Sequence, residues 1–314
     1  MHLGNGAITA ECALLTAGAA AAGLGWAAVA ARRVPLSRDR LLLAGGLLAG
    51  GLGALVFAAQ AVNVQVLPGA SAHLVGGVLL AAALGPSLGA WTMAIILAVQ
   101  ALVLGDGGLA SLGANILNMA ILPAGLVLLA KQFSAAESRL PHWQTAGLAV
   151  LAVPLAALLI VGETALFRSG AELAGWQAFA ARMIGTHLWI GLAEGGLTLA
   201  AAVGLAWLAR PAGAPQRALP TFASVIAAVA VAVAAFPWSS ALPDGYEAAA
   251  ESAGLGRWLA QGSGTLAAVQ SAVVEAAQRV APGEQACLVV AMLLTAAIVL
   301  AFASLSTRRQ VAPG

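Results

Sequence analysis

The chain has 314 residues, of which 61% are hydrophobic and only 8% are charged, and its mean hydropathy is +0.95. A soluble globular domain carries roughly 25% charged residues, so this composition excludes a water-soluble protein and indicates an integral membrane protein. Such hydrophobicity also excludes intrinsic disorder, and a net charge of +2 is too small and too dispersed for nucleic-acid binding. The two cysteines, Cys12 and Cys287, lie in separate apolar segments and form neither a disulfide framework nor a zinc cluster.

Apolar segments long enough to approach a membrane span recur along the whole chain. A spanning helix needs about 20 mostly apolar residues, and Gly- and Ala-rich helices pack closely in lipid. The sequence therefore predicts an all-α integral membrane protein, with a compact bundle of about seven transmembrane helices followed by a two-helix C-terminal module. The predicted spans are residues 7–31, 41–60, 73–84, 90–104, 112–129, 146–167, 184–208, 221–238 and 286–305.

Basic residues in the short loops predict the orientation of these helices, because cytoplasmic loops are enriched in Arg and Lys. An external N-terminus places ten of the fourteen basic residues on the cytoplasmic side, and the C-terminus with them. The first apolar segment precedes its basic cluster, so it is predicted to be a retained helix rather than a signal peptide. The ten are Arg32, Arg33, Arg38, Arg40, Lys131, Arg139, Arg210, Arg217, Arg308 and Arg309.

A Pro-, Gly- and Arg-containing segment at residues 211–220 divides the chain into two parts. We predict a seven-span domain at residues 1–210, a cytoplasmic linker at 211–220 and a two-span module at 221–314. The module contains an external stretch of about 47 residues, 239–285, with helix-compatible segments. We expect this stretch to form a small helical hairpin on the outer surface.

The second residue, His2, gives the N-terminus a specific chemistry. Met1 is expected to be retained, because removal of the initiator methionine normally requires a small second residue. The Met1 amine, the His2 amide nitrogen and the His2 ring Nδ1 can then chelate one metal ion in two fused rings. Three coplanar nitrogens leave one equatorial position, a geometry that suits Ni(II) and Cu(II) and accommodates Co(II). Taken alone, His2 also fits a chance histidine in a flexible tail.

Other polar residues are candidates for a supporting role. His187 and Glu194 are seven residues apart on one helical face; they fit a buried polar pair that joins two helices, although ionisable residues within a membrane are functional candidates. His142 fits an interfacial residue without a function. Further polar residues are expected at the external mouth, where a structural hydrogen-bond network explains each of them as well as metal ligation does. They are Gln60, Asn63, Gln65, Ser71, His73, Asp106, Asn115 and Asn118.

Several separated motifs in order give the chain a resemblance to the CbiM/NikM family, the substrate-binding components of cobalt and nickel energy-coupling-factor transporters. The resemblance covers about residues 1–208, and Leu3-Gly4-Asn5-Gly6 departs from it by lacking the usual proline and acid. The motifs are Met1-His2 with Gly6, Phe57 to Val66 with Gln60 and Asn63, Ser71-Ala72-His73-Leu74-Val75-Gly76-Gly77, Gly105-Asp106-Gly107-Gly108, Gly113-Ala114-Asn115 with Asn118-Met119, and His187 with Ile190-Gly191 and Glu194.

The resemblance implies which residues bind the metal. In the family, the Met1 amine, the amide and ring of His2, and a second histidine hold the ion, and the second histidine corresponds to His73. The supporting residues would be Gln60, Asn63, Ser71, Asp106, Asn115 and Asn118. Beyond residue 208, Pro243-Asp244-Gly245-Tyr246-Glu247 resembles the Pro-Asp-Gly-Leu-Glu signature of the small companion subunit, here fused, with Tyr246 in place of Leu.

The resemblance further implies high-affinity uptake of Ni²⁺ or Co²⁺ across a bacterial-type cytoplasmic membrane, with the metal as transported substrate and no cofactor. The partners would be a transmembrane coupling subunit and two cytoplasmic ATPases, which agrees with the absence of a P-loop motif from this sequence. The fused module is expected to help load or gate the metal site, although Asp244 and Glu247 also fit a helix cap. The alternatives are a proton-coupled secondary transporter that uses Glu11 and Glu194 as a relay, and a metal-dependent hydrolase based on His187 and Glu194.

Overall fold

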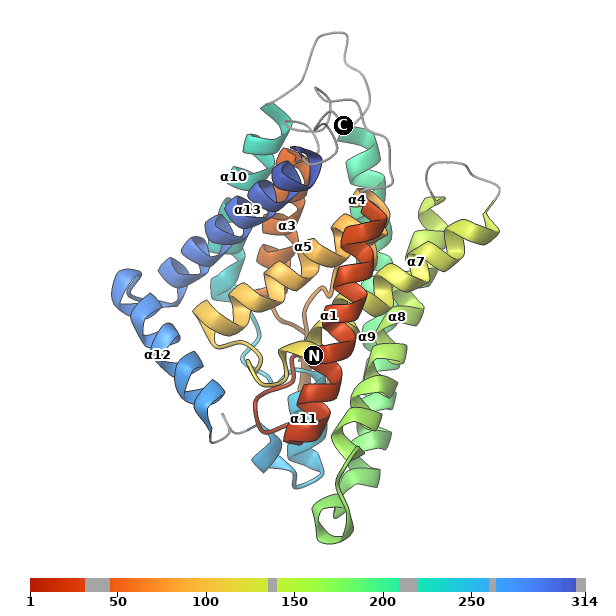
Figure 1. Cartoon of the computed structure of the whole chain (residues 1–314), viewed down its shortest axis with the longest axis vertical. Coiled ribbons are helices and arrows are strands. Elements are labelled where there is room, and N and C mark those ends of the chain that lie inside the picture. Colours follow the sequence, from red (N-terminus) through yellow and green to blue (C-terminus); the bar gives the residue numbers. More distant parts are fainter. Residues whose placement is uncertain (32–45, 135–139, 209–218, 260–263, 309–314) are drawn as a thin grey trace.

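The computed structural model describes residues 1–31, 46–134, 140–208, 219–259 and 264–308. Six helical segments within these residues are long and apolar enough to cross a membrane, so the prediction of a multi-pass helical membrane protein is confirmed (Figure 1). The helices are α1 (Ala10–Ala31), α3 (Gly46–Gln60), α4 (Gly77–Leu84), α5 (Pro86–Val99), α6 (Leu112–Ile116), α7 (Leu122–Phe133), α8 (His142–Ala165), α9 (Trp176–Leu208), α10 (Leu219–Ala235), α11 (Gly245–Ser252), α12 (Thr265–Val280) and α13 (Glu284–Arg308).

Small residues allow the helices to approach one another closely, as the composition predicts. A Cβ atom at Gly113 of α6 would lie 2.4 Å from the backbone nitrogen of Ala17 in α1, and one at Gly89 of α5 would lie 2.5 Å from the Cα of Ala81 in α4. Larger side chains at these two glycines would push the helix backbones apart, and close backbone approach is what drives helix association in lipid. The bundle around the N-terminus therefore depends on them.

The predicted third span, residues 73–84, is wrong. Its helix, α4, begins only at Gly77 and has 8 residues, which at a rise of about 1.5 Å per residue gives roughly 12 Å, too little to cross a bilayer. Gly76 at its start has φ 75°, a left-handed conformation that prevents the helix from extending toward His73. Because α4 is buried among the other helices, it does not need to reach both membrane surfaces.

A β-hairpin precedes α4, at a position where no strand was predicted. Strands β1 (Val64–Leu67) and β2 (Ala70–Ala72) are antiparallel. The C-terminal part of the chain extends this small sheet, because Ser71 forms a parallel bridge with Asp244 and its N–H donates to the carbonyl of Pro243 over 2.8 Å. The segment before α11 is thereby fixed beside the loop that carries His73.

Two π-helical turns interrupt the helices on either side of the loop that contains Asp106. The first, Gln100–Leu104, continues α5, and the second, Leu117–Ile121, joins α6 to α7. Such turns occur mostly as single-turn bulges inside α-helices and often at functional sites. The loop between them, residues 105–111, therefore leaves the bundle from an interrupted helix and returns into another.

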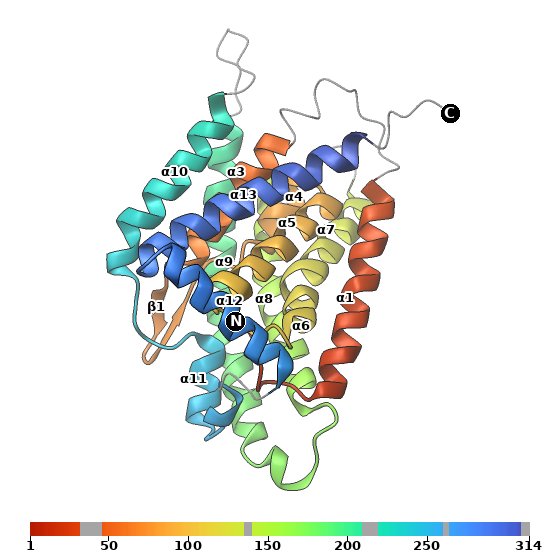
Figure 2. The ribbon, with the colours of Figure 1, turned by 60° about the vertical axis from the view of Figure 1, so that its left-hand side comes forward.

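The C-terminal helices pack on the N-terminal bundle. Figure 2 shows α10 and α13 crossing beside α3, while α11 contacts α9 and α12 lies against the π turn Gln100–Leu104. The stretch at residues 239–285 contains helices as predicted, but α11 and α12 contact different parts of the bundle instead of forming the predicted hairpin. Tyr246 and Trp258 are buried there and pack their rings edge-to-face on Phe179 of α9, with centroid distances of 6.0 and 5.1 Å.

The helix directions agree with the predicted alternation across the membrane. In Figure 1 the ends of α1, α9 and α13 and the starts of α3 and α10 lie at the upper end, whereas Met1 lies well below them. Most of the predicted cytoplasmic basic residues and nearly all of the linker at 211–220 lie outside the described residues. The orientation and the domain boundaries therefore stay predictions.

Candidate metal centre

The N-terminus is buried inside the molecule rather than free as a tail. Met1 and His2 are only 4% and 7% exposed. Leu3 fixes their position, because its N–H donates to Asn115 Oδ1 over 2.9 Å and its carbonyl accepts from Ser111 Oγ over 2.5 Å. Backbone groups buried in this way need partners, and these bonds supply them. The interpretation of His2 as a chance histidine in a flexible tail is therefore wrong.

Glycines let the loop around Asp106 approach the N-terminal residues. The N–H of Gly108 donates to the carbonyl of Leu3 over 2.8 Å. A Cβ at Gly108 would lie 2.4 Å from the backbone nitrogen of Asn5, and Gly107 has φ 82°. Only glycine permits both the close approach and this backbone conformation. The glycine run thus brings Asp106 next to His2.

The structure brings together the two histidines that the sequence predicts as ligands. The rings of His2 and His73 lie edge-to-face with centroids 5.4 Å apart. Nδ1 of His73 lies 3.0 Å from the carbonyl oxygen of Leu74; because a carbonyl only accepts, Nδ1 carries the proton and Nε2 keeps a lone pair for a ligand. Burial, together with the nearby N-terminal amine, lowers the pKa of His73 to about 4, so its imidazole is neutral, as metal ligation requires.

Two nitrogens of the predicted chelate each face a carboxylate. The Met1 amine donates to Oδ2 of Asp244, and Nδ1 of His2 lies 3.1 Å from Oδ1 of Asp106. Burial raises the pKa of Asp244, but the charge and hydrogen bond of the amine outweigh that effect and hold this pKa well below its usual range. Asp244 is therefore ionised, and its charge stabilises the buried ammonium group.

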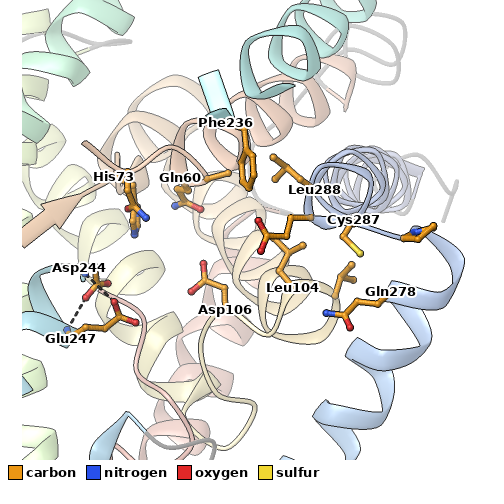
Figure 3. A pocket seen from close by; sticks show the side chains of 16 residues that line it. Gln60, His73, Leu104, Asp106, Phe236, Asp244, Glu247, Gln278, Cys287 and Leu288 are labelled. Atoms are coloured by element: carbon orange, nitrogen blue, oxygen red, sulfur yellow. Dashed lines mark hydrogen bonds between the residues drawn. The ribbon is translucent and has the colours of Figure 1, made fainter. Parts of the chain in front are cut away.

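A cavity of ≈ 540 Å³ leads to this cluster from between the N-terminal bundle and the C-terminal part of the chain. Figure 3 shows His73, Asp106 and Asp244 around it, with Gln278 and Cys287 on the opposite side. Its lining contains four acidic side chains and, among the described residues, no Arg or Lys, so it attracts cations. The four are Asp106, Asp244, Glu247 and Glu284.

Most of the predicted supporting residues hold elements together. The Nε2 of Gln60 donates to the carbonyl of Val75 over 2.7 Å, and Ser71 Oγ donates to the carbonyl of Leu242 over 2.7 Å. Asn118 donates through Nδ2 to Oε2 of Glu163 over 2.8 Å, and so joins the second π turn to α8. Of these and the other supporting candidates, Gln60, Asn63 and Asp106 line the cavity.

His187 and Glu194 do not form the predicted pair. Both are buried on α9, but the carboxylate of Glu194 accepts from the N–H groups of Val75 and Gly76 over 2.8 and 2.7 Å, whereas Nδ1 of His187 lies 2.7 Å from the carbonyl of Met183. Glu194 therefore fixes the segment that follows His73. Within the described residues, no three His, Cys, Asp or Glu side chains lie close enough together to bind one metal ion. The predicted chelate does not need such a cluster, because two of its ligands are the N-terminal amine and a backbone amide.

Replacing Glu194 with alanine is expected to lower stability and metal retention together, because two buried N–H groups would lose their acceptor at a cost of about 1–3 kcal/mol each. Glu194→Gln keeps one acceptor oxygen and should cost less. The measurement is thermal unfolding in detergent beside metal content after gel filtration. Glu11→Ala is the control, because Glu11 is exposed at the start of α1; an equal loss from that variant would contradict the assigned role of Glu194.

Sequence reasoning missed two residues that fix the N-terminal loop. Gln270 of α12 is 1% exposed; its Oε1 accepts from Asn5 Nδ2 over 2.7 Å, and its Nε2 donates to the carbonyl of Gly107 over 2.7 Å. Arg168 donates to the carbonyls of Ala7 and Gly6 over 2.9 and 3.3 Å. In the sequence, Gln270 is marked by its position among apolar residues of an amphipathic helix. Arg168 is marked as one of the few basic residues on the predicted external side.

Comparison with known proteins identifies relatives of the chain. A family model described as "CbiM: Cobalt uptake substrate-specific transmembrane region" matches residues 2–212. A putative fused nickel transport protein NikMN of Archaeoglobus fulgidus is 53% identical over 68 residues, which are 22% of this chain and 23% of the relative. A putative metal transport protein of Haloquadratum walsbyi is 33% identical over 176 residues, 54% of this chain and 74% of the relative. The match to NikMN thus spans under a quarter of that protein's length.

The fold agrees with a solved structure as well. A crystal structure of a transition metal transporter matches with a TM-score of 0.54 and 25% identity, over 66% of this chain and 93% of that chain. These relatives and this structure are named as metal transport proteins and not as enzymes, which favours the prediction of a transporter over the alternative of a hydrolase. Fused relatives agree with a companion module joined to the same chain. The family model covers about two thirds of the sequence, and the chain therefore belongs to the CbiM family of cobalt uptake substrate-specific transmembrane regions.

Proposed function

We propose that this protein captures Ni²⁺ or Co²⁺ at the external membrane face with the Met1 amine, the amide nitrogen and Nδ1 of His2, and Nε2 of His73. The observation that carries the proposal is the burial of an N-terminal Met-His pair with the two histidine rings 5.4 Å apart. In this scheme the chain is the substrate-binding component of an energy-coupling-factor transporter. A transmembrane coupling subunit and two cytoplasmic ATPases would be its partners.

The chemistry of capture depends on the protonation state of the nitrogens. A metal ion must replace one proton of the Met1 ammonium group and the proton of the His2 amide. Nδ1 of His2 must also leave the Asp106 carboxylate and give up the proton that it donates there, so that its lone pair turns to the ion and all three protons pass to solvent. Nε2 of His73 is already deprotonated when Nδ1 donates to Leu74. Four nitrogens in a plane suit Ni(II) and Cu(II), and Co(II) is the other candidate cargo.

The proposed orientation puts the N-terminus outside and the C-terminus in the cytoplasm of a bacterial-type cell. The acidic cavity would then open outward, where its charge raises the local concentration of a divalent cation. The fused module supplies Asp244, Glu247 and Glu284 to the lining, which supports a role for it in loading or gating the site.

Coupling to ATP distinguishes this proposal from a proton-coupled transporter. The two carboxylates of the alternative relay have unlike surroundings, because Glu11 is exposed at the start of α1 and Glu194 is bonded to backbone N–H groups. Metal uptake should stop when the partner ATPases are deleted. Uptake that persists in their absence would instead favour the proton-coupled mechanism.

His73→Ala is expected to weaken Ni²⁺ or Co²⁺ binding roughly tenfold to a hundredfold, since even outer-shell changes at metal sites commonly have effects of this size. The purified chain with its native N-terminus would be titrated with each metal by calorimetry. His142→Ala is the matched control, because His142 begins α8, whose start lies in the upper part of Figure 1, away from the N-terminus. Equal losses from both substitutions would show a general folding effect or a different site.

A further inference from the structure

One carboxylate of the C-terminal module has two separate tasks. Oδ1 of Asp244 accepts from the N–H groups of Tyr246 and Glu247 over 2.8 and 2.9 Å and so caps α11. Glu247 returns the bond, because its Oε2 accepts from the N–H of Asp244 over 3.0 Å. This is the capping box that the sequence allowed. Since Oδ1 is used by the cap, Oδ2 is the oxygen that holds the Met1 amine.

The backbone around Asp244 is fixed from two sides. On one side Asp244 bridges to Ser71 of the hairpin. On the other, Gly245 lies directly on α9, where a Cβ would come within 2.7 Å of His187 Cε1 and 2.8 Å of Ile190 Cδ1. The carboxylate is also largely shielded from solvent, at 15% exposure. The ion pair between the Met1 amine and Asp244 therefore differs from exposed ion pairs, whose side chains move freely and whose attraction adds little to stability.

From this geometry we infer that Asp244 is a positioning residue that seats the Met1 amine beside His73 before any metal arrives. The inference rests on the proposed function, because it gives the amine a place in the chelate. An N-terminal residue without this partner would sample many conformations, and each binding event would have to order it again. With Oδ2 of Asp244 in place, that ordering is complete in advance, which is the general way in which preorganisation strengthens binding.

The test measures how accessible the amine is in the full chain, with its native N-terminus and stripped of metal. The chain has a single lysine, Lys131, so the α-amine and that side chain are its two primary amines. Acetylation by an N-hydroxysuccinimide ester, followed by digestion and mass spectrometry, gives both rates in one sample. In Asp244→Asn the amide oxygen still caps α11, since Asn is among the best N-cap residues. The Met1 amine should then acetylate about tenfold faster than in the wild type, because a charge-assisted bond is lost, while Lys131 keeps its rate.

Two further variants separate positioning from other effects. Glu247→Gln removes the same charge from the same helix without touching the amine, and its Met1 rate should equal that of the wild type. Gly245→Ala leaves all charges in place but displaces the loop from His187, and its rate should rise. An unchanged Met1 rate in both Asp244→Asn and Gly245→Ala would overturn the inference, and so would an equal rise in Glu247→Gln.

Adding Ni²⁺ to the same assay distinguishes this inference from the proposed function. Protection of the wild-type Met1 amine by Ni²⁺ supports the chelate, and absence of protection contradicts it. Neither result bears on the rates measured without metal. Fast acetylation of Asp244→Asn without Ni²⁺ protection of the wild type would keep the positioning role and reject the chelate. Ni²⁺ protection of the wild-type Met1 amine, together with a wild-type acetylation rate in Asp244→Asn, would keep the chelate and reject the positioning role.

Discussion

A chain extended by one residue before Met1 is expected to bind Ni²⁺ and Co²⁺ at least about a hundredfold more weakly than the native chain, beyond the 10–100-fold effect of outer-shell changes. The extension turns the Met1 amine into an amide and moves the new terminus away from His2, so the five-membered ring of the chelate is lost. It also places extra atoms where Met1 is only 4% exposed and its nitrogen already contacts Asp244.

The measurement is metal titration of two preparations that differ at the N-terminus alone. One retains a short tag, and the other is matured so that the chain begins at Met1. A chain with the same tag at the C-terminus controls for the tag itself. Equal affinity of the N-terminally extended and native chains would reject the metal site, whatever their stability.

A chain that ends at Ala214 is expected to insert into the membrane and to transport metal at least about tenfold more slowly, as loss of a bond worth on the order of 1.5–3 kcal/mol allows. The helices of the predicted N-terminal domain, α1 to α9, can satisfy their own backbone hydrogen bonds in lipid, so this domain should fold. The truncation removes the Asp244 carboxylate from the amine and the Gln270 amide from Asn5. Both contacts fix the loop that begins with the proposed ligands.

The truncated chain would be compared with the full chain by detergent stability and by metal uptake with the partner subunits present. Full transport would show that the C-terminal part is dispensable. Failure to insert would show that α10 and α13, which pack on α3, belong to the core of the fold. The matched point variant is Gln270→Leu, which keeps the whole module but removes four hydrogen bonds around the N-terminal loop.

The long helices were predictable because continuous apolar stretches have few other structures available in a membrane. The ends of these helices were less predictable. Helix α9 begins at Trp176 and not at the predicted residue 184, and α8 begins at His142 and not at the predicted residue 146. The hairpin was missed because β1 has only 4 residues, too few for a period of two to be distinguished beside a predicted helix. Its pairing with the segment before Asp244 depends on a contact between distant parts of the chain, which local patterns do not reveal.

The site was predictable to the extent that its chemistry is local. Met1 and His2 are adjacent, and a terminal amine beside a histidine suggests chelation without any knowledge of the fold. The partner of that amine, Asp244, is 243 residues away, so only the folded chain identifies it. Helical spacing correctly placed His187 and Glu194 on one face, but it could not indicate that the partners of Glu194 are two N–H groups of a loop.

The π turn Gln100–Leu104 sets the direction in which the glycine loop, residues 105–111, leaves the helix bundle. An α-helix advances about 100° for each residue, and each π turn accommodates one residue more than a regular turn. If the same residues were wound as a regular α-helix instead, the extra residue would rotate the glycine loop by roughly that angle. Asp106 would then point away from His2, and Gly108 would leave Leu3. A one-residue deletion within Gln100–Leu104 would return the turn to a regular α-helix and keep the direction of the loop. A one-residue deletion within residues 105–111 would instead shorten the connection that brings Asp106 to His2 and Gly108 to Leu3.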